Sequence, residues 1–183
     1  MPRNAGQRLT FLLLSFLLFL VSVSYEPTVY GNDPASIQRY LAVHEGRRLG
    51  DHVEILAVED VGADRFAVFR LETKRPDERY VVRFRRNEQG NYEGYGHCEW
   101  MYGPYPAGVY TQPVGGGPKE QAVHYVIWNE SEKLAEVRFQ LNGGDVESVR
   151  IPSAPSLTVW KFRSLSGSWH LETGYFAADG TEL

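Results

Sequence analysis

The stretch Asp64–Arg86, DRFAVFRLETKRPDERYVVRFRR, contains two runs in which hydrophobic side chains recur at every second position. A period of two is typical of β-strands, because successive side chains point to opposite faces of the sheet. In the first run the two faces carry Phe66, Val68 and Arg70 on one side and Ala67, Phe69 and Leu71 on the other. In the second run they carry Tyr80, Val82 and Phe84 against Val81, Arg83 and Arg85. The KRPDE between the runs is rich in turn residues, so the stretch predicts two antiparallel strands.

The same period continues on both sides of this pair. HVEILAVEDVG at residues 52–62 and NYEGYGHCEWM at residues 91–101 each predict one further strand. Upstream, DPASIQRYLAVHEG indicates an amphipathic helix, in which Asp33 caps the first turn and Pro34 takes the first helical position. A helix followed by an antiparallel meander predicts an α+β unit over residues 25–102.

The second half of the chain predicts β-structure throughout. Residues 103–120 hold four prolines and the run Gly115–Gly117, so we expect a linker or a long surface loop there. Five strand-length runs follow in residues 121–183, separated by turn sequences such as Asn142-Gly143. We therefore expect a mostly antiparallel α+β protein whose β-rich second half resembles a sandwich.

The N-terminus has the pattern of a secretory signal. Arg3 and Arg8 precede the apolar run Leu9–Val23, and small residues at Ser22 and Ser24 would allow cleavage after residue 24. The alternative is a retained membrane anchor, since the cleavage site is a weak one. Either way, residues 1–24 predict export, with the protein extracellular or tethered to the outer face of the cytoplasmic membrane through this segment alone.

The charge balance of the remaining chain argues against nucleic acid as a partner. Of the 19 Lys and Arg, two lie in residues 1–24, so the rest carries 17 basic and 23 acidic side chains. Such a surface does not attract phosphate-rich polymers or anionic lipids by charge. The single cysteine, Cys98, excludes an internal disulfide and is expected to be buried, to be a reactive thiol, or to link to another chain.

No motif in the chain identifies a catalytic residue, a metal site or a cofactor. The five histidines show no metal-ligand spacing, and His97, Cys98 and Glu99 would alternate faces on a strand. A thiol hydrolase using Cys98 remains an alternative, with His124 or His52 as the base brought near by the fold. The run Gly115–Gly117 lacks the Lys and Ser/Thr of a phosphate-binding loop.

Aromatic residues are concentrated between positions 92 and 110, with Gly and Pro between them. Exposed aromatics on a constrained segment favour recognition of carbohydrate, peptide or a protein partner. The candidate ligand-binding residues are Tyr95, Trp100, Tyr102 and Tyr105. In the alternative interpretation, these rings are core residues that cover the seam between the two halves.

Several segments resemble a group of uncharacterised exported proteins of Gram-positive, Bacillus-like bacteria. They include the export signal, DPASIQRYLAVHEG, FAVFRLETKRPDERYVVRFRRNEQGNYEGYG, HYVIWNE and TVWKFRSLSGSWHLETGYFAADGTEL. Many proteins of that group are similar to lipoproteins, and this chain departs from them because no cysteine follows its apolar run. The resemblance implies a cell-envelope protein and carries over no site. We expect a binding or interaction module, the alternatives being the thiol hydrolase and a membrane-anchored structural partner of another envelope protein.

Overall fold

The computed structural model describes residues 28–45, 52–73, 75–103, 105–113, 120–162, 165–166 and 168–183. The expected signal segment, residues 1–24, and the Gly115–Gly117 run lie outside the described residues. Within the described residues, no helix is both long enough and apolar enough to cross a membrane.

Helix α2 (Pro34–His44) begins where the sequence predicts. The side chain of Asp33 accepts a hydrogen bond from the backbone N–H of Ser36, and the Ser36 hydroxyl in turn accepts one from the N–H of Asp33. These bonds satisfy two backbone donors that a helix end leaves without partners, and Pro34 has no N–H to satisfy. The cap therefore fixes the start of the helix, and Ile37 and Leu41 are buried on its inner face.

Sheet A contains five strands, which pair antiparallel in the order β1-β2-β3-β4, with β5 also on β3. They are β1 (Val53–Val61), β2 (Asp64–Leu71), β3 (Arg79–Arg86), β4 (Tyr92–Gly94) and β5 (Glu99–Met101). The single strand expected at residues 91–101 is therefore wrong. The chain leaves β3 after Gly94 and returns at Glu99, and Gly96 between them has a φ of 85°, which favours glycine.

The second half forms two further antiparallel sheets. Sheet B contains β6 (Ala107–Pro113), β7 (Glu120–Asn129), β10 (Ser156–Lys161) and β11 (Leu165–Ser166). Sheet C contains β8 (Glu136–Leu141), β9 (Val146–Arg150) and β12 (Leu171–Phe176).

Part of the expected linker at residues 103–120 is a strand. Residues 107–113 form β6, which pairs antiparallel with residues 121–127 of β7. The prolines do not prevent this, because Pro106 immediately precedes the strand and Pro113 ends it. Pairing with a distant strand thus overrides the local signal of a proline- and glycine-rich segment.

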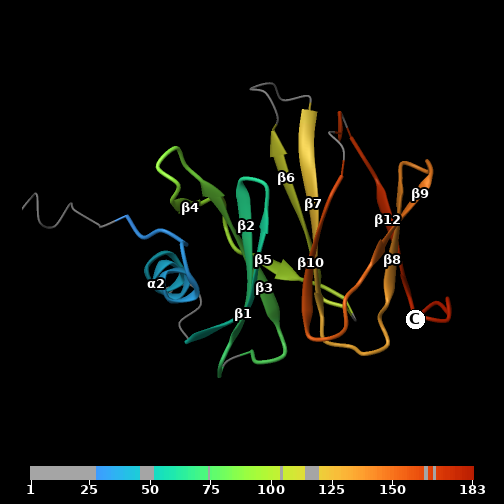
Figure 1. The fold of residues 1–183 in the computed structure, drawn as a ribbon, viewed down its shortest axis with the longest axis horizontal. Helices are drawn as coiled ribbons and strands as arrows, with labels where there is room; N and C mark the ends of the chain where they lie inside the picture. The colour runs from blue at the N-terminus through green and yellow to red at the C-terminus, as the bar shows by residue number, and fades with distance from the viewer. Residues whose placement is uncertain are drawn as a thin grey trace, which may run out of the picture.

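The helix and the three sheets are stacked as four layers, in the order α2, sheet A, sheet B, sheet C (Figure 1). The helix and sheet A enclose one core, whose members include Ile37, Leu41, Phe69, Val82 and Phe84. Sheets A and B enclose a second core of Phe66, Val68, Val81, Met101, Val126 and Trp128. Sheets B and C enclose a third core that is rich in aromatic rings. The mostly antiparallel α+β fold, with a sandwich-like second half, is confirmed.

The alternation in β2 and β3 determines which side chain enters which core. Phe69 and Val82 face the helix, whereas Phe66 and Val81 face sheet B, as the sequence predicts. Both faces of sheet A are covered, so these strands are apolar on both sides.

Candidate functional site

Trp100 and Tyr102 form an exposed aromatic pair at the end of β5, which we call the Trp100–Tyr102 pair. Their ring centroids are 4.7 Å apart and the planes are inclined by 44°. Trp100 is 42% exposed and Tyr102 is 63% exposed. Large aromatic residues are usually more buried than this in a monomer, so the pair is a candidate contact surface.

The pair is held by backbone pairing on both sides. Trp100 lies directly opposite Tyr80 in the β3–β5 register, and the Tyr80 ring stacks on Phe69 with centroids 5.4 Å apart. Tyr102 exchanges two backbone hydrogen bonds with Ala107, at 3.0 and 3.1 Å, at the start of β6. The two rings are therefore carried on a backbone that is already ordered, which lowers the entropy cost of binding.

Polar side chains accompany the strand partner of Trp100. The hydroxyl of Tyr80 donates a hydrogen bond to the carboxylate of Glu78, and Arg75 Nη1 lies 3.3 Å from Glu78 Oε2. Burial and this carboxylate raise the pKa of Tyr80 above its ordinary value, so its hydroxyl keeps its proton. Tyr80, the residue opposite Trp100 in the sheet, is therefore linked to a short chain of polar side chains, Glu78 and Arg75, whose opposite charges balance.

The other two predicted residues are placed elsewhere. Tyr95 is exposed, but its ring lies 4.9 Å from the guanidinium of Arg83, on the face of sheet A that turns toward sheet B. Tyr105 packs against the third core, with its ring centroid 5.0 Å from that of Tyr175. The structure thus brings together two of the four candidates, and the other two belong to different surroundings.

Cys98 is buried in the core between α2 and sheet A, with 5% of its surface exposed. His124, one of the bases considered for it, lies on β7 in the second core, where its ring is 5.2 Å from that of Phe66. Sheet A therefore separates the thiol from this histidine.

A buried charged cluster between sheets A and B was not predicted from the sequence. Arg83 donates two hydrogen bonds to one carboxylate oxygen of Asp64, at 2.8 and 3.2 Å, and His124 Nε2 lies 3.9 Å from the other oxygen. Among the described residues, neither ring nitrogen of His124 has a hydrogen-bond partner, and its side chain is 1% exposed. We call these residues the Asp64–Arg83–His124 cluster.

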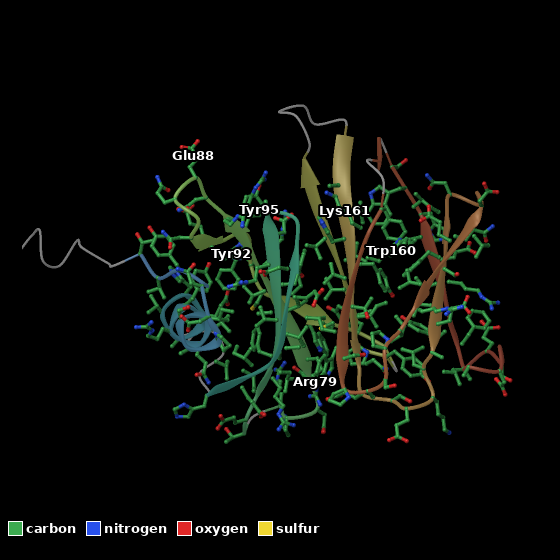
Figure 2. The ribbon with its side chains drawn as sticks, viewed as in Figure 1. Arg79, Glu88, Tyr92, Tyr95, Trp160 and Lys161 are labelled. Carbon is green, nitrogen blue, oxygen red and sulfur yellow. The ribbon has the colours of Figure 1, made fainter. Side chains whose placement is uncertain are left out.

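Burial and two neighbouring cations keep His124 neutral. Loss of solvent is the largest effect, followed by the charge of Arg83, and together with Lys161 they lower the pKa of His124 to about 4. The carboxylate of Asp64 acts in the opposite direction, but it is already hydrogen bonded to Arg83. Tyr95 and Lys161 lie near one end of the A–B interface and Arg79 near the other (Figure 2).

The cluster has a weak signal in the sequence. Arg83 falls on the same strand face as Val81 and stands between the apolar residues Val82 and Phe84, and His124 lies inside the apolar run AVHYVIW. A charged residue in such a place requires a buried partner. The sequence does not show which residue that partner is, because Asp64 and His124 are brought together only by the stacking of the sheets.

An open groove of about 510 Å³ lies between residues 28–33 and helix α2. Arg39 and Val43 line its helical side, and Tyr30 lines the opposite side. Asp33, which also lines the groove, is already engaged in capping the helix. The groove therefore offers one cationic side chain, Arg39, beside apolar side chains such as Val43.

Comparison with known proteins gives no relative, since no family model, no curated protein and no solved structure matches the chain. Within the residues that the structure describes, no three His, Cys, Asp or Glu side chains gather where they could hold a metal ion.

Proposed function

We propose that this chain is an exported binding module of the cell envelope and that the Trp100–Tyr102 pair is its contact surface. The observation that carries the proposal is the exposure of two large rings on a backbone fixed from two directions. Tryptophan and tyrosine are the residues that most often dominate binding energy at protein surfaces, because they bury much area with few rotatable bonds.

Export supports a role outside the cytoplasm. The basic and apolar segments of residues 1–24 predict it, and the resemblance to exported proteins of Bacillus-like bacteria implies the same location. The partner is then a component of the envelope, either a protein, a peptide or a carbohydrate. The membrane is contacted through the N-terminal segment, and nucleic acid is not a partner of this acidic chain.

The experiment is to express the whole coding sequence in a Gram-positive host and measure retention of the exported product on isolated cell envelopes. A Trp100→Ala, Tyr102→Ala double variant is expected to lose binding by at least about tenfold, since it removes both exposed rings. Mass spectrometry of the N-terminus, on the same material, determines whether residues 1–24 have been removed.

Tyr95→Ala is the matched control, because Tyr95 is an exposed aromatic of similar accessibility on the other face of sheet A. It is expected to bind envelopes as the unmodified protein does. Equal retention of the double variant, with its circular dichroism spectrum unchanged, would contradict the proposal.

A further inference from the structure

We propose that the Trp100–Tyr102 pair binds an uncharged, hydroxyl-rich glycan, with the face of a pyranose ring lying on the indole of Trp100. This inference rests on the proposed function and names the class of ligand. It follows from the geometry of the rings, the shortness of β5 and the charge around the site.

The ring geometry suits a sugar. One face of a pyranose presents C–H groups, whose partial positive charge is attracted to the negative face of an aromatic ring. The two rings are inclined by 44° rather than stacked in parallel, and both residues remain exposed. An angled surface of this kind can contact two sides of one sugar unit or two successive units of a chain.

The backbone around the pair does not suit an extended peptide. A peptide that adds a strand needs a row of unpaired N–H and C=O groups. β5 has three residues, and one of its edges is taken by β3. The N–H and C=O of Tyr102 are bonded to Ala107, and the positive φ values of Gly96 and Gly103 turn the chain away on either side. Binding must therefore use side chains.

The surrounding charge disfavours an anionic partner. The chain has a formal net charge of −4, and Glu99 next to Trp100 is exposed. Phosphate-rich wall polymers and acidic lipids would be repelled by such a surface. Arg75 and Glu78 form an ion pair, so the two described charged side chains linked to Tyr80, the strand partner of Trp100, balance one another.

Arg75 and Glu78 also supply the polar groups that hydroxyls require. Their side chains are 61% and 24% exposed. A guanidinium offers several donors and a carboxylate offers several acceptors, both in a fixed plane, and adjacent sugar hydroxyls both donate and accept. A stacked sugar ring with hydroxyls directed toward this polar chain satisfies both kinds of contact.

The test is calorimetric titration of the exported protein with cellohexaose, maltohexaose and N-acetylated chitohexaose, three uncharged probes. We expect at least one to bind, with affinity reduced at least about tenfold in Trp100→Ala and less in Trp100→Phe, which keeps an aromatic face. Glu78→Gln is expected to weaken binding several-fold, and Tyr95→Ala is expected to bind as the unmodified protein does.

The outcomes separate this inference from the proposed function. If none of the three probes binds while envelope retention still depends on Trp100, the glycan inference is overturned and a protein partner takes its place. If envelope retention does not depend on Trp100 at all, both proposals fall. Saccharide binding that Trp100→Ala leaves unchanged would also overturn the inference, because it would place the sugar elsewhere.

Discussion

The two interfaces on either side of sheet B are built from different chemistry. Between sheets A and B, the apolar core is bounded by charged groups, with the Asp64–Arg83–His124 cluster at one end and an ion pair of 2.8 Å between Arg79 and Glu130 at the other. Between sheets B and C, rings pack edge to face, as in the contact of Phe139 with Phe162 at 5.2 Å. Trp160 lies in this second interface, between β10 and sheet C (Figure 2).

The comparison shows two ways of stabilising a stacked sheet. In the B–C interface the hydroxyls of Tyr125 and Tyr175 bond to each other at 2.9 Å, and burial raises the pKa of Tyr125 well above its ordinary range. The hydroxyl of Tyr125 therefore stays protonated at every physiological pH. The A–B interface instead contains a buried ion pair and a histidine whose pKa is lowered by burial and by neighbouring cations, so its stability depends on pH.

The largest expected effect comes from removing one charge of the A–B cluster. Asp64→Asn leaves the buried guanidinium of Arg83 without the carboxylate that neutralises it, and such a change costs about 3–5 kcal/mol of unfolding free energy. Urea unfolding followed by circular dichroism measures the loss. The control is Glu136→Gln, which alters a more exposed pair on sheet C and is expected to change the midpoint little.

The double variant Asp64→Leu, Arg83→Leu tests whether the loss in Asp64→Asn comes from an uncompensated buried charge. It removes both charges, so most of the stability lost in Asp64→Asn is expected to return. If Asp64→Asn unfolds at the same urea concentration as the unmodified protein, the ion pair does not stabilise the A–B interface.

The second effect is a pH dependence of the unfolding free energy, which we expect from His124 in the A–B interface. In the unfolded chain His124 takes up a proton near pH 6.5, whereas in the folded protein its pKa is about 4. Between pH 6.5 and 4.5 the unfolded state therefore binds a proton that the folded state excludes. The free energy of unfolding is expected to fall by about 2 kcal/mol over this range.

Urea unfolding at several pH values between 7 and 4.5 measures this slope. His124→Leu is expected to flatten it, and His170→Gln, which changes a histidine exposed at the surface, is expected to leave it as it is. A slope that is identical in His124→Leu would show that other groups cause the dependence.

The smallest effect is expected in the B–C interface. Tyr125→Phe removes the hydroxyl that bonds to Tyr175 and keeps the ring, so the loss of unfolding free energy is about 1 kcal/mol. Since burial keeps the hydroxyl of Tyr125 protonated, the loss should be equal at pH 5 and pH 8. A loss that differed between these two values would contradict the contrast between the two interfaces.

The local pattern of the sequence predicted the parts of the fold that depend on neighbouring residues. The helix start follows from Asp33 and Pro34, and the two faces of β2 and β3 follow from alternation. Strand β6 was missed because its stability comes from pairing with β7, which the Pro- and Gly-rich composition does not reveal. The break between β4 and β5 was missed because a single glycine, Gly96, turns the chain inside an apparently continuous run.

The part of the candidate site that the sequence predicted also depends on the local pattern of neighbouring residues. Trp100 lies on β5 and Tyr102 directly follows it in extended backbone, two residues further on, so alternation alone puts their rings on the same side. Tyr95 and Tyr105 are close in sequence to this pair, but beyond the turns at Gly96 and Gly103 Tyr95 lies on the other face of sheet A and Tyr105 packs against the third core. Because the chain changes direction twice between Tyr95 and Tyr105, residues that are close in sequence here lie in different surroundings.

Strand β7 is enclosed on every side. Residues 122–129 are buried, sheets A and C lie beyond its two faces, and β6 on one edge and β10 on the other take up its backbone groups. Its amide hydrogens therefore exchange with deuterated water only when whole layers separate, whereas amides at the rims of sheets A and C exchange through local fraying. The amide hydrogens of β7 are therefore expected to be among the last to exchange, and their rate of exchange reports the global unfolding of the molecule.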